Sequence, residues 1–245
     1  MLTLLKKTSL AAIALGVIAP FSGHAANATN ADVTKAETSA QQAVAPLARD
    51  SGNTADKAAS KAREQLVKRL SALKTLKGQF IQTLSGKDGK QLQETQGDFT
   101  FKHPGFYHWQ SDDPYPQTVV GNGETVWIYD PDLEQVTIAK QATMPYNPAN
   151  LLSGGFNDLA ARYAIAQSVN GDSEQFVLTP LERASAPFVE LGIHFSAGVL
   201  QEAILLDRLG QTTRISFSKT NSQVKVDDSF FDFDIPAGTD ILMND

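Results

Sequence analysis

Apolar residues follow a helical period at the start of the folded region and a strand period after it. Leu66, Leu70 and Leu73 are spaced i, i+4, i+7, which is the spacing of one face of an α-helix. From residue 80 onward the period changes to two, as where Phe99 and Phe101 alternate with Thr100 and Lys102. Alternate side chains of a strand point to the same face. The pattern therefore predicts an amphipathic helix followed by β-structure.

The alternation recurs in short runs that are separated by turn residues. Gly, Asn, Asp and Pro cluster at the breaks, as in Gly121-Asn122-Gly123. Such closely spaced hairpins favour one antiparallel sheet that curls towards a barrel. Two short helices are expected midway, at 147–152 with a proline in the first turn and at 159–162. The expected strands cover residues 80–84, 91–102, 106–110, 118–120, 124–129, 135–139, 163–168, 176–179, 188–196, 201–207 and 212–219.

The first sixty residues differ from the rest in composition. Lys6 and Lys7 precede an apolar run over residues 9–21, and small residues then flank a cleavage position after Ala25. This layout predicts a secretory signal peptide at 1–25. The alternative, a transmembrane anchor, needs about 20 apolar residues, and the run over residues 9–21 is too short for that.

Residues 26–60 are rich in Ala, Thr, Ser and Gln and contain no aromatic residue, which predicts a flexible tether or a weak helix. The folded domain is expected at 61–245. We expect the mature protein to be soluble.

Composition excludes several kinds of chemistry. The chain has no cysteine, which rules out disulfides, thiol catalysis, cysteine-ligated metals and a lipid on an N-terminal cysteine. Its net charge of −6 disfavours nucleic acid and anionic lipid surfaces as partners. His103 and His108 lie on either side of a Pro-Gly break, and no cluster of metal ligands is visible. We also find no nucleophile elbow, P-loop or dinucleotide fingerprint. The sequence therefore predicts no metal, no cofactor and no enzymatic activity.

Large apolar side chains occupy many of the expected strands. Residues 126–129 are apolar on both faces, and Ile193 and Phe195 share one face of a later strand. One interpretation is an ordinary hydrophobic core. The other is an apolar cavity between a curved sheet and short helices, in which each buried CH₂ of an acyl chain would contribute about 0.8 kcal/mol. The residues alone leave both interpretations open.

Taken together, several segments resemble the LolA family of periplasmic outer-membrane lipoprotein carriers. The resemblance runs from about Glu64 to Ile241, and the long block 96–131 carries most of it. That block contains GDFTFKHPGFYHW and VGNGETVWIYDP, and shorter matches are GQFIQ near residue 80, FVLTP at 176–180 and FDIPAG at 233–238.

The resemblance implies a fold and a function. The fold class is α+β, mainly β: a single antiparallel sheet curled into an unclosed half barrel with a helical lid. The implied function is that of a periplasmic chaperone, a monomer that binds lipoprotein acyl chains in a cavity. It would take them from an ATP-driven inner-membrane release complex and deliver them to an outer-membrane receptor. The implied cavity and lid residues are Phe99, Phe101, Trp109, Trp127, Leu151 and Leu152.

Two further positions acquire roles through the resemblance. The family typically has an arginine before the proline of residue 104, where this chain has His103. That arginine is thought to hydrogen-bond the lid to the barrel, so His103 is predicted to be a weaker or pH-sensitive lid latch with its counterpart near residues 151–154. Tyr107 lies near the family's partner-facing edge and is predicted to face a partner.

Two other functions compete with transport. A periplasmic regulator of related fold would sense lipid or lipoprotein rather than carry it. Such regulators commonly have a second domain, and this chain ends soon after residues 233–238, which favours a carrier. A lipid- or glycan-active enzyme is the third possibility, and it is disfavoured because no acid/base or nucleophile constellation is visible.

Overall fold

The computed structural model describes residues 51–112, 114–144, 146–154, 156 and 159–244. The predicted signal peptide and most of the predicted tether lie outside these residues. The first described element is helix α1 (Ser51–Ala72), which leads into strand β1 through a short connection. Leu66 and Leu70 are fully buried, as the helical period of the sequence predicts. Within the described segments, no helix is long and apolar enough to cross a membrane.

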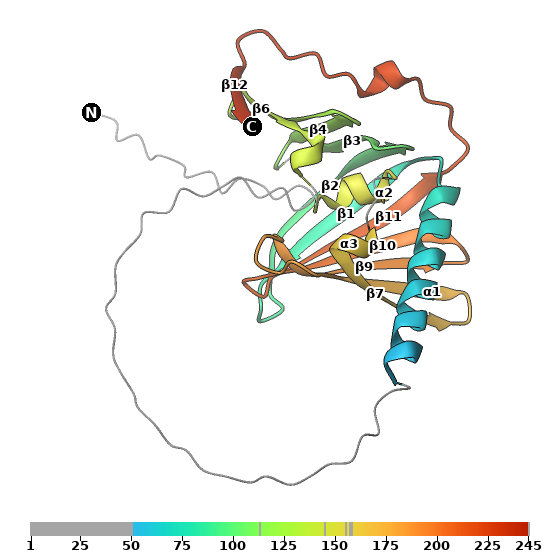
Figure 1. The fold of residues 1–245 in the computed structure, drawn as a ribbon. Helices are drawn as coiled ribbons and strands as arrows, with labels where there is room; N and C mark the ends of the chain where they lie inside the picture. Colours follow the sequence, from blue (N-terminus) through green and yellow to red (C-terminus); the bar gives the residue numbers. More distant parts are fainter. Residues whose placement is uncertain (1–50, 113, 145, 155, 157–158, 245) are drawn as a thin grey trace, which may run out of the picture.

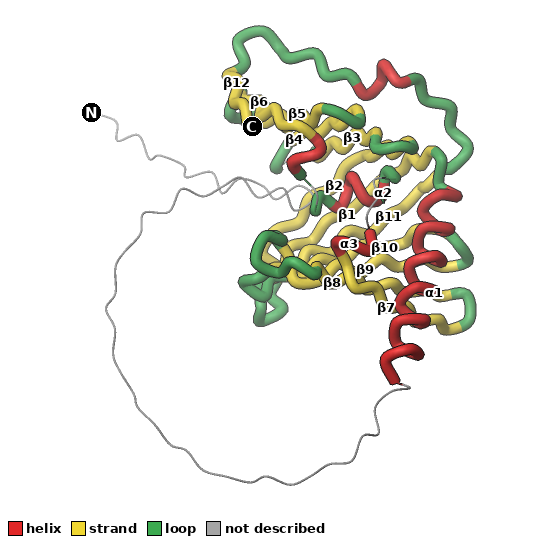
Figure 2. The backbone as a smooth tube through the Cα atoms, in the orientation of Figure 1, coloured by secondary structure: helices red, strands yellow, loops and turns green. Residues whose placement is uncertain are grey.

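Twelve strands form one sheet whose two edges are β12 and β7 (Figures 1 and 2). Their order is β12-β6-β5-β4-β3-β2-β1-β11-β10-β9-β8-β7, so the sheet is not closed into a barrel. The strands are β1 (Thr75–Ser85), β2 (Gln91–Lys102), β3 (Phe106–Ser111), β4 (Gln117–Asn122), β5 (Thr125–Asp130), β6 (Gln135–Lys140), β7 (Tyr163–Asn170), β8 (Ser173–Pro180), β9 (Phe188–Ser196), β10 (Val199–Asp207), β11 (Thr212–Asn221) and β12 (Asp240–Asn244).

Three further helical elements lie in the connection between β6 and β7. They are the 3₁₀ turn η2 (Gln141–Thr143), α2 (Pro148–Leu152) and α3 (Leu159–Arg162). Figure 2 shows them, with α1, on the concave side of the curved sheet. Side chains from α1, α2 and alternate strand positions form one hydrophobic cluster between helices and sheet. The predicted class, a mainly β half barrel with a helical lid, is confirmed.

The other face of the sheet is partly covered by the C-terminal segment, residues 222–239. This segment contains the 3₁₀ turn η3 (Asp228–Phe231), in which Phe231 is fully buried. The Phe231 ring lies 5.4 Å from that of Phe106, and Phe233 lies 5.6 Å from Tyr129, measured between ring centroids. The segment ends in β12, which pairs with β6 in parallel.

Two boundaries differ from those expected. The predicted tether reaches residue 60, but α1 already begins at Ser51, so the last ten residues of that range are helical. Most of the side chains between residues 56 and 60 are exposed. An exposed helical turn gives no apolar period, and the sequence pattern therefore left a tether or a weak helix open here; the structure has a helix. Strand β12 was also not expected, and it is the exception to the predicted antiparallel pairing.

Candidate functional site

The candidate site is the aromatic concave face of β1, β2, β3 and β11. Phe99, Phe101 and Trp109 point to this face because they occupy alternate positions of paired strands. Phe99 lies 5.0 Å from Phe101 and 6.0 Å from Trp109, and Phe80 stacks on Trp109 at 3.7 Å, all between ring centroids. Phe217 of β11 packs edge-on against Phe99. The structure brings these predicted residues together.

Helix α2 places Leu151 and Leu152 over this aromatic face. Its first turn is set by Asn147, whose side-chain oxygen accepts a hydrogen bond from the backbone N–H of Ala149 at 2.9 Å. Pro148 follows at the first helical position, where a missing N–H costs nothing. Both leucines are buried in the same cluster as Phe99 and Trp109. Their predicted place in the lid is consistent with this position.

Trp127 lies on the opposite face of the sheet from Trp109. Its neighbours Val126 and Ile128 pack into the concave cluster, and alternation along β5 therefore turns Trp127 away from it. The expectation that Trp127 lines the cavity is wrong for this reason. Residues 126–129 are apolar on both faces because the C-terminal segment covers the outer one, as the Tyr129–Phe233 contact shows.

The interior expected to be a cavity is closed in this structure. Phe99, Phe101 and Trp109 are each exposed by 1% or less, and Leu151 and Leu152 by 4% or less. The described helices therefore pack directly on the aromatic face. An acyl chain would have to replace the contacts that these helices make.

Gln141 of η2 makes three side-chain hydrogen bonds, which join α2 to two loops of the sheet. Its Nε2 donates to the carbonyl oxygen of Gly105 at 2.9 Å and to Oδ1 of Asn150 at 2.8 Å. Its Oε1 accepts from the backbone N–H of Gly123 at 3.1 Å. Gln141 itself is 4% exposed. A lone glutamine at the end of a strand gives no sequence signal, and this residue was not predicted.

Tyr107 belongs to the lid attachment and does not face outward. Its side chain is fully buried, its ring covers Gly121, and its hydroxyl accepts a hydrogen bond from Nδ2 of Asn147 at 3.2 Å. Burial raises the pKa of Tyr107 well above its usual range. The prediction that Tyr107 faces a partner is therefore wrong for this closed arrangement.

His103 lies against the segment that follows α2, where its counterpart was expected. Its ring packs on Gly154 and lies 5.4 Å from the ring of Phe156. The hydrogen bond between the two segments is made next to it, by the backbone N–H of Gly105 and the carbonyl of Ser153 at 2.8 Å. Nε2 of His103 is buried without a partner among the described residues, and burial lowers the pKa of His103. Its hydrogen-bonding role as a latch stays a prediction.

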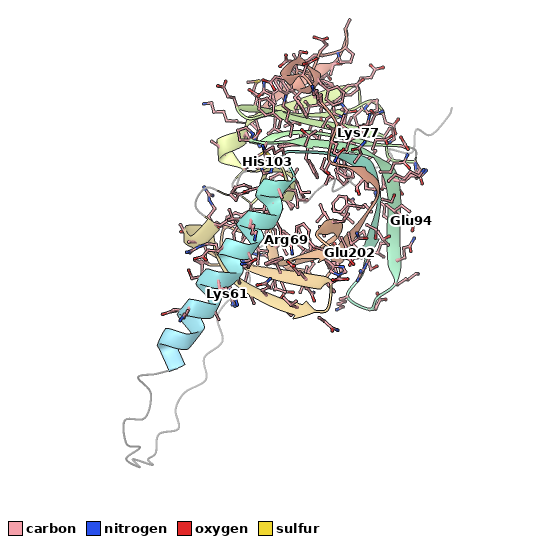
Figure 3. All side chains as sticks on the ribbon, turned by 90° about the vertical axis from the view of Figure 1, so that its right-hand side faces the viewer. Lys61, Arg69, Lys77, Glu94, His103 and Glu202 are labelled. Carbon is pink, nitrogen blue, oxygen red and sulfur yellow. The ribbon has the colours of Figure 1, made fainter. Side chains whose placement is uncertain are left out.

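Helix α1 is held to the other half of the sheet by an ion pair. Nε of Arg69 donates to Oε2 of Glu174 on β8 at 2.9 Å, and its Nη2 contacts the second carboxylate oxygen. This contact lowers the pKa of Glu174 and raises that of Arg69. Figure 3 shows α1 lying across the curved sheet, with Arg69 on the helix and His103 near its C-terminal end.

The described part of the chain contains no group of three or more His, Cys, Asp or Glu side chains placed to hold a metal ion. The features of the site are instead apolar: an unclosed sheet, an aromatic concave face, and short helices attached to it by a few polar contacts. They define a protein of the half-barrel class with a helical cover.

Comparison with known proteins gives the family. The sequence profile of the outer membrane lipoprotein carrier protein LolA matches residues 71–234. The chain is 39% identical over 186 residues to the outer-membrane lipoprotein carrier protein of Pseudomonas putida strain GB-1, covering 74% of this chain and 89% of the relative. It is 37% identical over 188 residues to that of Azotobacter vinelandii strain DJ, covering 75% and 90%.

A solved structure of a LolA superfamily protein from Nitrosomonas europaea shares 11% identity at a TM-score of 0.42, covering 70% of this chain and 98% of that one. This score is low, and the assignment rests on the sequence matches. The chain belongs to the LolA family, and the resemblance stated above is confirmed. Family membership makes it a carrier protein rather than an enzyme.

Proposed function

We propose that this protein carries lipoproteins through the periplasm with their acyl chains held between the sheet and its helices. The observation that carries the proposal is the aromatic concave face beneath α2, which few polar contacts keep closed. In this view the structure represents the closed form of the carrier. Cargo would enter by moving α2 and the segment after it away from Phe99, Phe101 and Trp109.

Apolar burial makes such an exchange favourable. Opening the lid exposes Leu151, Leu152 and the aromatic face, which costs free energy because apolar surface meets water. An acyl chain that fills the opening restores this burial and adds its own. At about 0.8 kcal/mol per CH₂, a chain of palmitoyl length contributes on the order of 10 kcal/mol. The same exchange in reverse allows release to an acceptor with a comparable apolar site.

The proposed route follows from the family and from the N-terminal sequence. The predicted signal peptide at 1–25 would direct export to the periplasm. An ATP-driven complex of the inner membrane would load the carrier, and a receptor at the outer membrane would accept the cargo. The carrier would act as a monomer, with no nucleic acid or cofactor involved.

Native mass spectrometry of the full chain purified from the periplasm tests this function. We expect a fraction of the protein to carry a triacylated protein, and this cargo to leave when outer-membrane vesicles are added. Leu152→Gln places an amide in the buried lid and should reduce the loaded fraction. Leu209→Gln is the matched control, because Leu209 is 76% exposed.

Two results would contradict the proposal. A periplasmic protein that never carries an acylated polypeptide would exclude the carrier function. Cargo that binds but stays bound in the presence of outer-membrane vesicles would favour the sensing regulator instead.

A further inference from the structure

The concave face has a second region that is polar rather than aromatic. Five uncharged polar side chains on it are 5–9% exposed. Each lies two or four residues from an apolar member of the concave cluster on the same strand, and alternation therefore places it on the same face. We call these residues the polar belt, and they are Gln82 of β1, Thr95 of β2, Ser111 of β3, Gln117 of β4 and Thr213 of β11.

The polar belt lies at the strand ends away from the lid. Helix α1 joins the sheet at the start of β1, and the lid is tied to Gly105 and Tyr107 at the start of β3. Ser111 is the last residue of β3, and Gln82 lies towards the end of β1. Figure 1 shows the turn between β1 and β2 at the end of these strands that lies away from α2. The belt therefore lies towards the end of the curved sheet opposite the lid.

A small pocket marks this region. It is lined by Leu84 and Gln93 together with Gln82, Thr95 and Thr213 of the belt, and its volume is ≈ 10 Å³. That is roughly the room for one water molecule. Nε2 of Gln93 donates to the hydroxyl of Thr95 at 3.4 Å. Amide and hydroxyl groups line this pocket, with no charged group among its lining residues.

Trp109 lies next to the belt and has an unused hydrogen-bond donor. The whole side chain is inaccessible to solvent, and its indole Nε1 has no hydrogen-bond partner among the described residues. Trp109 is two residues from Ser111 and stacks on Phe80, which is two residues from Gln82. A buried N–H without an acceptor destabilises the closed state, because it has lost its hydrogen bonds to water. A ligand with a carbonyl oxygen would restore that bond.

We propose that Trp109 and the polar belt bind the ester and amide carbonyls that join acyl chains to the rest of the cargo. The inference rests on the proposed function and adds an orientation to it. The acyl tails lie on the aromatic face beneath the helices, and their carbonyls lie at the belt. Ester carbonyls accept hydrogen bonds and donate none. The belt and Trp109 supply donors to such carbonyls: glutamine amides, threonine and serine hydroxyls and an indole N–H. None of these groups is charged, which suits a neutral ester or amide linkage.

The test compares two lipopeptides that differ only in this linkage. One carries a diacylglyceryl cysteine with ester-linked palmitoyl chains, and the other carries ether-linked chains of the same length. Binding to the purified full chain is measured by displacement of a fluorescent fatty acid. We expect wild type to bind the ester about fivefold to tenfold more tightly than the ether, as one or two hydrogen bonds would give. Trp109→Phe keeps an aromatic ring but removes the N–H, and it should abolish this preference.

A second pair of variants controls for folding. Thr95→Val removes a belt hydroxyl at nearly constant volume and should also reduce the ester preference. Thr100→Val removes an equally buried hydroxyl from the other face of the same strand and should leave binding unchanged. Thermal melting of all variants verifies that each is folded.

The outcomes separate this inference from the proposed function. If wild type binds neither lipopeptide, the proposed function fails. If wild type binds ester and ether equally, or if Trp109→Phe weakens both equally, the carrier function stands and the carbonyl site is refuted. A diacyl phospholipid added as a second ester probe distinguishes the source of the carbonyl. Binding of the lipopeptide alone assigns the belt to lipoproteins, and binding of both supports recognition of the shared ester group.

Discussion

Gln141 shows how one side chain can hold a lid. Its amide serves the loop at Gly105, the turn at Gly123 and helix α2 through Asn150. Replacing it by leucine removes all three hydrogen bonds and leaves a backbone N–H and a carbonyl without that partner. We expect Gln141→Leu to lower the free energy of unfolding by about 2–3 kcal/mol and to speed hydrogen exchange in α2. Urea denaturation measures the first effect, and exchange mass spectrometry the second.

The control is Gln91→Leu at an exposed position of β2, which should change stability by less than about 0.5 kcal/mol. Equal exchange of α2 in wild type and Gln141→Leu would show that Gln141 does not hold the lid.

We predict that His103 gives the lid a dependence on pH. Burial lowers the pKa of His103 in the closed state, so an open lid binds a proton more readily than a closed one. Opening is therefore favoured as pH falls below the ordinary histidine pKa of about 6.5, and the closed state is fully favoured above it. We expect exchange protection around Leu151 to be weaker at pH 5.5 than at pH 7.5, after correction for intrinsic rates. In His103→Leu this difference should vanish; a difference that persists would assign the effect to another group.

The sequence predicted the positions of site residues well where one face of a strand is clearly apolar. It predicted them poorly where both faces are apolar or where the contact is distant in sequence. Phe99, Phe101 and Trp109 lie together, because residues two apart on a strand share a face. Trp127 was placed wrongly because its strand is apolar on both sides, and alternation then gives no direction. Tyr107 was placed wrongly because its partner, Asn147, is forty residues away in sequence.

At the scale of elements, the C-terminal segment is held to the outer face by aromatic side chains and by Lys102, which contacts Val226 and Asp228. Phe231 is fully buried there, whereas its neighbour Phe230 is 45% exposed. We expect Phe231→Ala to lower the free energy of unfolding by about 3–5 kcal/mol, and to increase exchange in β12. Phe230→Ala should cost much less, about 1 kcal/mol, because half of that ring already meets water. Similar losses in the two variants, measured by urea denaturation, would contradict the assigned packing.

The ion pair between Arg69 and Glu174 adds to the apolar packing that holds helix α1 to the sheet. Hydrogen bonding lowers the pKa of Glu174, so this contact stabilises the folded state above the ordinary glutamate pKa of about 4.3. The stabilisation is lost as pH falls through the lowered pKa. We expect Glu174→Gln to cost about 0.5–1 kcal/mol at pH 7, allowing for the partial exposure of Arg69, and less at pH 3.

The control for Glu174→Gln is Glu202→Gln, which removes the ion pair between Glu202 and Arg214 on two neighbouring strands. Only Glu174→Gln should increase exchange in α1. Increased exchange in both variants would assign the effect to a general loss of stability.

Strands were predictable as elements because period two is a strong local signal. β2 and β9 have the expected bounds, and most other strands differ by a few residues at their ends. β12 was missed because it is short and exposed throughout, and because it joins β6 by a pairing distant in sequence. The start of α1 could not be fixed for a related reason, since residues 56–60 are mostly exposed and give no apolar period.

At the scale of the whole molecule, the half barrel and lid could be expected from the family resemblance, but the closed interior could not. Whether aromatic residues on a curved sheet meet each other, a helix or a cavity depends on packing between segments distant in sequence. The structure shows that the described helices close over the aromatic face. Function as a carrier then requires a change of state, and the lack of cysteine in the chain allows that change to be tested directly.

A cross-link across the lid should block uptake of cargo. Glu124 adjoins Gln141 through a backbone hydrogen bond of 2.7 Å, and Gln141 binds Asn150 of α2. The double variant Glu124→Cys/Asn150→Cys, joined by a short reducible linker, would tie α2 to the turn between β4 and β5. We expect the linked protein to bind no lipopeptide and to recover binding after reduction, because cargo and lid occupy the same apolar face.

The control joins Glu202→Cys to Arg214→Cys with the same reagent. These residues form an ion pair across adjacent, already paired strands, so the linker should not restrict α2, and binding should match that of wild type. Undiminished binding by the Glu124–Asn150 linked form would mean that cargo enters without displacing α2. The path would then lie at the opposite end, past the polar belt, where no helix has to move.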